Sequence, residues 1–161
     1  MSALFLLDQR CKYSKGLVLT ITVRISLALG MAHICHLTVL NPARHSRIFS
    51  KMALSQVRAG HRVTIIGQDA ATEPYEYEGI RIVPTGVFGR MSGRRLRANI
   101  WMPDLAFSTQ ADLFQFHTPE LFPTIRTLKA DRPGIRLVYD RHEDYPANIR
   151  HSNAYPAWSR G

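Results

Sequence analysis

Short apolar runs alternate with helix-forming segments along most of this chain, and that alternation limits the folds open to it. Five short runs are apolar or alternate apolar with polar side chains, as strands do: residues 33–39, 62–67, 79–84, 111–116 and 135–139. Between them, residues 46–59 have apolar side chains at helical spacing, and residues 119–129 begin with proline and glutamate, which suit a first helical turn. Strands separated by helices of this length form parallel sheets with right-handed crossovers. We therefore expect residues 31–150 to fold as one α/β domain, a Rossmann-like parallel sheet with helices on both faces.

The length and composition describe a soluble globular protein. The chain has 161 residues, of which 45% are hydrophobic and 20% charged, enough for one domain with a proper core. The formal net charge of +9 favours anionic partners such as phosphates, nucleotide sugars, acidic lipids or nucleic acid. The cysteines, Cys11 and Cys35, are too few for a disulfide framework, so we expect a reduced, cytoplasmic protein.

The N-terminal segment, residues 1–30, differs from the rest. Residues 16–30 form an apolar run that Arg24 interrupts, and the run is too short to cross a membrane, which takes roughly 20 apolar residues. A secretory signal is one interpretation, because basic residues precede the run and small residues end it. We favour another, in which Met31 is the true start and residues 1–30 are an extension outside the fold. Residues 151–161 are expected to be a truncated tail.

Polar side chains gather after three of the expected strands. Residues 41–47 follow the first strand, residues 117–120 the fourth and residues 140–144 the last. The carboxyl ends of parallel strands lie at one edge of a sheet, where open α/β sheets bind ligands, so these tips are expected to converge. His117 is the candidate for catalysis, because imidazole exchanges protons near neutral pH and a strand supports it rigidly. The alternative is a structural histidine that caps the next helix or bonds a backbone carbonyl.

Other residues at these tips are candidates for binding the substrate. Arg44 and Arg47 lie near the start of the first helix, where the helix N-terminus would help them meet a phosphate; ordinary surface arginines are the alternative. His142 and Glu143 are expected to contact a substrate hydroxyl or His117, with a solvated loop as the alternative. The complete set of predicted substrate contacts is Asn41, Arg44, Arg47, Glu120, Asp140, His142 and Glu143.

The stretch His33-Ile34-Cys35-His36 resembles a metal-binding cluster without its geometry. Strand alternation places His33 and Cys35 on one face and His36 on the other, and no C-x-x-C or H-E-x-x-H motif accompanies them. We interpret all three as core residues and expect no metal. The loop L-N-P-A-R-H-S-R after the first strand lacks the G-x-G-x-x-G fingerprint, which argues against an NAD-dependent dehydrogenase, so no cofactor is expected.

An arginine-rich segment separates the third and fourth expected strands. Residues 79–103 contain no acid, and apolar Met91, Leu96 and Ile100 are interleaved with four of its arginines: Arg90, Arg94, Arg95 and Arg97. This composition suits contact with an anionic ligand or membrane surface. The alternative is an amphipathic helix packed on the sheet with its arginines in water. No nucleic-acid-binding motif is present, so we expect no nucleic-acid partner.

Five stretches are familiar as a set. They are M-A-H-I-C-H-L-T, R-I-F-S-K-M-A-L-S-Q-V-R-A-G-H-R-V-T-I-I, G-I-R-I-V, F-H-T-P-E-L and V-Y-D-R-H-E-D-Y-P. Together they resemble the N-terminal half of the glycosyltransferase family 4 enzymes. The last two stretches are the most specific, and the resemblance covers nearly all of residues 31–150 in the right order.

The resemblance implies a GT-B fold, in which two Rossmann-like domains enclose the active site. The N-terminal domain would recognise a glycan or lipid-linked acceptor, and a C-terminal domain would hold the nucleotide-sugar donor, in a metal-independent transfer that retains the anomeric configuration. It implies that His117 lies beside the transferred sugar and residues 140–143 on the acceptor side. Many members act at the cytoplasmic face of a membrane, which implies a cytoplasmic protein that can be peripheral at the inner face.

This chain departs from the family pattern in two motifs and in length. Family members usually have H-P-x-x-D-x-R-I-F after the first strand and F-H-D-P-E-L after the fourth, where this chain has N-P-A-R-H-S-R-I-F and Thr118 in place of the aspartate. The sequence ends at Gly161, before a donor-binding domain with its E-x7-E pair. We therefore expect a truncated domain that transfers no sugar alone, because a half-cleft cannot position a nucleotide sugar. The alternative is a non-catalytic Rossmann-like module that binds an anionic ligand or membrane surface.

Overall fold

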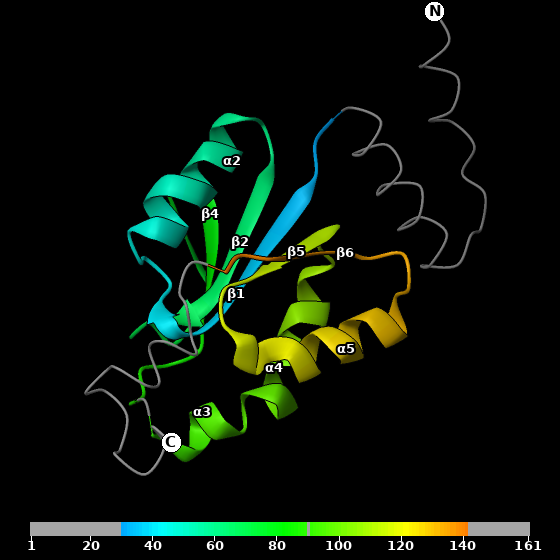
Figure 1. Ribbon diagram of the computed structural model, residues 1–161. Helices are drawn as coiled ribbons and strands as arrows, with labels where there is room; N and C mark the ends of the chain where they lie inside the picture. The colour runs from blue at the N-terminus through cyan, green and yellow to red at the C-terminus, as the bar shows by residue number, and fades with distance from the viewer. Residues whose placement is uncertain (1–29, 90, 142–161) are drawn as a thin grey trace, which may run out of the picture. The chain divides into compact units, whose positions relative to one another are not determined.

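A six-stranded sheet forms the centre of the fold. The computed structural model describes residues 30–89 and 91–141 (Figure 1). The chain divides into two units, Met1–Ala32 and His33–Gly161, and the sheet belongs to the second. Its strands follow the order β3-β4-β2-β1-β5-β6: β1 (His33–Pro42), β2 (Arg62–Gln68), β3 (Tyr75–Tyr77), β4 (Ile80–Pro84), β5 (Leu113–Phe116) and β6 (Arg136–Tyr139). All neighbours are parallel except β3 and β4, so the predicted parallel α/β sheet is confirmed.

The edge strand β3 was not among the predicted strands, because residues 69–77 are mostly polar and resemble a loop. Tyr75 pairs with Ile82 in the antiparallel ladder. The turn between β3 and β4 has positive φ angles at both Glu78 (50°) and Gly79 (74°), as in the tight turns that match the twist of a hairpin. A glutamate rarely takes the first of these positions, and the hairpin therefore had no recognisable turn signal.

Helical segments connect the parallel strands. The helix predicted over residues 46–59 is confirmed, although it begins as a π-helix, η1 (Arg47–Ala53), and becomes an α-helix, α2 (Leu54–Arg58), shortly before Gly60. The arginine-rich segment contributes α3 (Gly93–Leu96) and α4 (Ala98–Thr109). The helix predicted over residues 119–129 comprises η2 (Pro119–Leu121), a 3-10 turn, and α5 (Phe122–Asp131).

Helices cover both faces of the sheet, as predicted. α2 lies on one side, and α4 and α5 lie on the other (Figure 1). On the face that η1 and α2 cover, Ile48, Phe49 and Ala53 of η1 pack on strand residues such as Ile65 and Ile82. The core under α4 and α5 is larger, and its fully buried members include Cys35, Leu37, Met102, Phe114 and Leu128.

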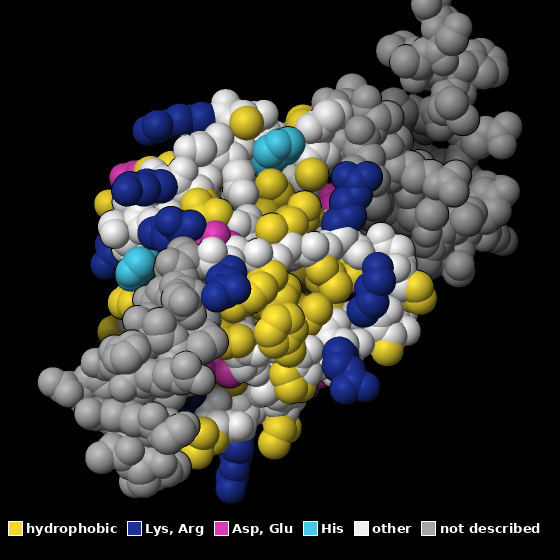
Figure 2. Space-filling view, viewed as in Figure 1, with side chains coloured by type: hydrophobic (Ala, Val, Ile, Leu, Met, Phe, Trp, Pro, Cys, Tyr) yellow, Lys and Arg dark blue, Asp and Glu magenta, His cyan; other side chains and the backbone are white. Residues whose placement is uncertain are grey.

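Apolar side chains also reach the surface near the end of the sheet. Figure 2 shows hydrophobic side chains gathered over β6 and α5, with Lys and Arg side chains around them. Phe122 packs edge-on against Phe116 and Tyr139, with ring centroids 5.4 and 5.3 Å away. This aromatic cluster joins α5 to the last two strands, because Phe116 ends β5 and Tyr139 ends β6.

Candidate functional site

The order of the strands reverses direction between β1 and β5. From β1 the chain continues through η1 and α2 to β2 on one side, whereas β5 pairs with the other side of β1 and leads through α5 to β6. Open α/β sheets bind ligands in the crevice outside the carboxyl ends of the strands at such a switch point. His117 follows β5, Asp140 follows β6, and Arg47 begins η1, so the fold brings all three to this edge.

His117 lies inside the protein with both ring nitrogens engaged. Its side chain is 0% exposed. Nδ1 lies 3.1 Å from Oδ2 of Asp140, and Nε2 lies 3.0 Å from Nδ1 of His36. The backbone N–H of His117 donates to the carbonyl of Leu37 at 3.2 Å, which fixes the residue against β1. The imidazole is thus held rigidly between a carboxylate and a second imidazole.

Asp140 connects His117 with Arg47 at the surface. The Arg47 guanidinium donates through Nη2 to Oδ1 at 3.0 Å and through Nε to Oδ2 at 3.4 Å, so it grips both carboxylate oxygens. The side chains of Arg47 and Asp140 are 44% and 13% exposed, which makes them the members of this trio that a ligand can reach. Burial alone would raise the pKa of Asp140, but the hydrogen bond from Arg47 and the charges of His117 and Arg47 outweigh it and lower that pKa.

His36 extends the chain of contacts from the edge into the sheet. Its Nε2 lies 2.7 Å from Oε1 of Gln56 on α2, and Nε2 of Gln56 donates to Oε1 of Gln115 at 3.3 Å. Burial lowers the pKa of His36, against opposing effects of Gln56 and the Asp140 charge. A chain of hydrogen-bonded polar side chains therefore runs from the surface into the sheet. Its members, in order, are Arg47, Asp140, His117, His36, Gln56 and Gln115.

The other predicted substrate contacts within the described residues lie in different surroundings. Arg44 places its guanidinium 5.3 Å from the centre of the Tyr77 ring at the β3 edge. Glu120 pairs with Arg95 at 2.6 Å, and its carbonyl accepts from the Asn99 side chain at 2.8 Å. Asn41 lies near the end of β1, where its backbone N–H donates to the Thr38 hydroxyl at 3.3 Å. His142 and Glu143 lie outside the described residues, as does Arg90.

The arginines of α3 and the one that follows it, Arg97, are divided between internal contacts and the surface. Arg94 donates from Nε to the carbonyl of Thr85 at 3.0 Å and lies over the Trp101 ring, 5.4 Å from its centroid. Arg95 forms the ion pair with Glu120. Arg97 is exposed. Arg94 and Arg95 therefore pack the helix against its neighbours as well as contributing charge.

The part that His36 plays in this site was not predicted from the sequence. Strand alternation correctly placed His36 on the face opposite Cys35, yet the residue was interpreted as core. Gln115 pairs with His36 in the β1–β5 register and is buried as well. The sequence did hold a signal for this chain of hydrogen bonds: two polar side chains, at paired positions of adjacent parallel strands that are buried.

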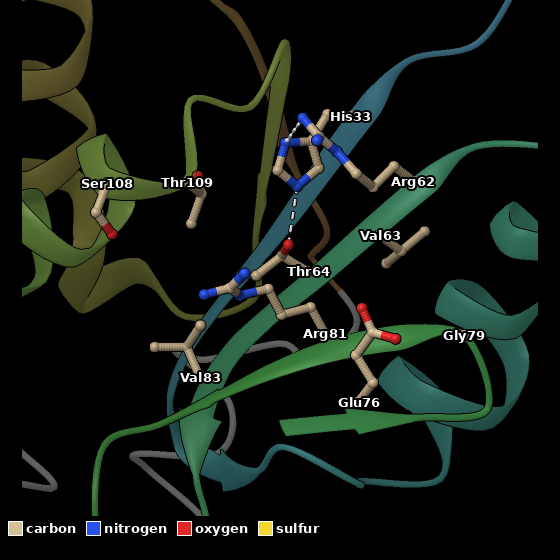
Figure 3. A pocket seen from close by; sticks show the side chains of 10 residues that line it. All are labelled: His33, Arg62, Val63, Thr64, Glu76, Gly79, Arg81, Val83, Ser108 and Thr109. Atoms are coloured by element: carbon tan, nitrogen blue, oxygen red, sulfur yellow. Dashed lines mark hydrogen bonds between the residues drawn. The ribbon is translucent and has the colours of Figure 1, made fainter. Parts of the chain in front are cut away.

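A separate cavity of about 280 Å³ lies at the opposite, amino edge of the sheet (Figure 3). Its lining includes Arg62, Arg81 and Glu76. Buried His33 accepts from Nη2 of Arg62 at 2.9 Å and contacts the Thr64 hydroxyl at 2.8 Å through Nε2. Burial and the Arg62 charge lower the pKa of His33 to about 4, so this histidine is neutral near pH 7.

Metal ligation and membrane crossing each need a recognisable arrangement of residues. In residues 30–89 and 91–141, no group of three His, Cys, Asp or Glu side chains has the arrangement needed to hold a metal ion. In the same ranges, no helix has both the length and the apolar character required to cross a membrane.

Comparison with known families agrees with the fold. Residues 46–161, which include η1, the β5 tip and the β6 tip, match the family described as Glycosyltransferase Family 4. No curated protein matched the chain. The match covers most of the sequence and agrees with a sheet of Rossmann-like type. This chain therefore belongs to glycosyltransferase family 4.

Proposed function

We propose that this chain provides the N-terminal, acceptor-side domain of a retaining glycosyltransferase. The domain spans residues 31–150, with residues 1–30 outside it, and acts in the cytoplasm on a glycan or lipid-linked acceptor. A second domain facing the carboxyl edge supplies the nucleotide-sugar donor. Family membership supports this proposal, and the observation that carries it is the convergence of Arg47, Asp140 and His117 at the switch point of the sheet.

The exposure of Arg47, Asp140 and His117 suggests a separate role for each side chain. Arg47 and Asp140 reach the surface, where they offer a cation and a carboxylate to the hydroxyl or phosphate groups of an acceptor. His117 lies behind Asp140 and fixes the position of its carboxylate. In this proposal a substrate meets Asp140 and Arg47 first, and His117 takes part in catalysis through Asp140.

Binding of acceptor-like sugars tests the proposal without requiring turnover. The purified chain is titrated calorimetrically with a panel of neutral oligosaccharides, sugar phosphates and nucleotide sugars. We expect an oligosaccharide or sugar phosphate to bind, and Arg47→Ala to weaken that binding by about 10- to 100-fold, the size of a charge-assisted hydrogen bond. Arg62→Ala at the amino edge is the matched control and should leave the affinity unchanged. Equal effects of the two substitutions would contradict the proposal.

A second candidate function is binding to an anionic membrane. Leu96 and Ile100 are 70% and 73% exposed, and Met91 is 75% exposed, beside the exposed Arg97. Apolar side chains next to basic ones favour the boundary between lipid headgroups and acyl chains. This surface would bring the acceptor-side domain to a lipid-linked acceptor.

Co-sedimentation with vesicles distinguishes this candidate. Binding to vesicles that contain phosphatidylserine should fall about fivefold in Arg97→Ala, since one basic residue near the surface contributes roughly 1 kcal/mol. Arg126→Ala, an exposed arginine on α5, is the control. Binding that is insensitive to added salt and to the Arg97 change would remove the membrane from consideration.

A further inference from the structure

The contact between His36 and His117 is a hydrogen bond in the plane of both rings. The ring planes differ by 9°, the centroids are 5.3 Å apart, and Nδ1 of His36 lies 3.0 Å from Nε2 of His117. Two imidazoles with centroids that far apart bring their nitrogens this close only when they meet edge to edge. One nitrogen must therefore carry the proton and the other must accept it.

Acceptors stand at both ends of this pair. Oε1 of Gln56 faces His36 at 2.7 Å, and the Asp140 carboxylate faces His117 at 3.1 Å. The three contacts need three protons, whereas two neutral histidines carry only two. The arrangement is complete when the pair holds one additional proton.

The amide of Gln56 is oriented by its own neighbours. Its Nε2 donates to Oε1 of Gln115, and Nε2 of Gln115 points at the sulfur of Met52, 3.9 Å away. If both amides were turned over, Gln56 could donate to His36 and the third proton would not be needed. Oε1 of Gln115 would then face the Met52 thioether, which has no proton to donate.

Two influences decide which ring carries the additional proton. Burial disfavours the cationic form of His36 and lowers its pKa. Asp140 is kept ionised by its lowered pKa and lies against His117. A buried cation is tolerated where a carboxylate and a second hydrogen bond compensate for the lost water.

We infer that His117 is an imidazolium cation, held between the Asp140 carboxylate and a neutral His36 that accepts its Nε2–H. His36 is a positioning residue: it carries its own proton on Nε2, donates it to Gln56, and presents a bare Nδ1 to His117. Among the residues that the structure describes, the charged and titratable groups around His117 include His36 from β1, Asp140 after β6 and, beyond Asp140, Arg47 from η1.

This assignment changes the charge of the candidate site. One carboxylate, Asp140, is shared by two cations, Arg47 and His117, which leaves a net charge of +1 among the three side chains. If the proposed transferase function holds, on which this consequence rests, the site favours an acceptor that carries an anionic group such as a phosphate.

Nuclear magnetic resonance tests the proton assignment in the unaltered chain. Long-range ¹H–¹⁵N correlation of the ¹⁵N-labelled protein at about pH 7 distinguishes protonated from bare ring nitrogens. We expect His117 to carry protons on both nitrogens and His36 to carry one on Nε2 alone. A bare Nε2 on His117, with the proton on Nδ1 of His36, would overturn the inference.

A substitution on α2 tests the proton count separately. Gln56→Leu removes the acceptor for His36, so two protons satisfy the remaining contacts and the imidazolium signals of His117 should be lost at the same pH. Ser55→Ala, at an exposed site on the same helix, should preserve them. A doubly protonated His117 in Gln56→Leu would contradict the inference. No sugar is used in these measurements, so their failure and the failure of the proposed function are independent.

Discussion

Replacing Asp140 with alanine should destabilise the domain far more than replacing its partner Arg47. Asp140→Ala leaves the buried His117 imidazolium without its carboxylate partner, and removing one member of a buried ion pair costs about 3–5 kcal/mol. Arg47 is 44% exposed, and water screens an exposed ion pair and solvates its partners, so Arg47→Ala should change the stability only slightly. Urea unfolding of the two variants gives both free energies.

A control and the pH dependence make this comparison decisive. Asp104→Ala, an exposed position on α4, should change the free energy of unfolding by less than about 0.5 kcal/mol. The pKa of Asp140 lies below its ordinary value of 3.8. The stabilisation that depends on its charge is therefore complete above that value and is lost as the pH falls through the lower folded pKa, where the difference between Asp140→Ala and the unaltered chain should become smaller. An Arg47→Ala variant as unstable as Asp140→Ala would show that the buried imidazole is not what Asp140 stabilises.

Three further predictions concern the frame around the site. Gly67→Ala should lower the free energy of unfolding by about 1–3 kcal/mol through overpacking, because its Cβ would lie 2.7 Å from Cγ2 of Thr38. Gly134→Ala, where an added Cβ has nothing within 4 Å, should not lower it, and thermal unfolding compares the two variants. Leu128→Ala should cost about 2–5 kcal/mol in urea unfolding, since the side chain is 0% exposed; a loss below about 1 kcal/mol would mean that α5 is loosely packed. The pKa of His33 is lowered from 6.5 to about 4 in the folded chain, so between these values the unfolded chain binds more protons and the stability should rise with pH. His33→Asn should flatten that rise.

The strands and main helices could be predicted because their signals are local. β1, β2 and β5 are apolar runs of β-branched and aromatic residues, and Gly60, with a φ of +87°, marks the end of the first helix. The meeting of the β5 and β6 tips also followed from the sequence, since parallel strands present their carboxyl ends at one edge. Periodicity and glycine placement therefore sufficed for most of the fold.

The contacts of individual polar side chains could not be predicted in the same way. Arg44 and Arg47 are three positions apart in one loop–helix segment, yet Arg44 lies over Tyr77 and Arg47 grips Asp140. Glu120 follows His117 closely, but Arg95 from a distant helix captures its carboxylate. The long reach of charged side chains and the positions of partners far along the chain decide these contacts.

Mapping where an acceptor-like sugar binds would decide whether the carboxyl edge of the sheet is the functional site. The ¹⁵N-labelled chain is titrated with the oligosaccharides and sugar phosphates of the binding panel, and the shifts of its backbone amides are followed. We expect the largest shifts at Arg47, His117 and Asp140, at the carboxyl edge. Shifts confined to the cavity around Arg62 and Arg81, at the amino edge, would contradict this assignment.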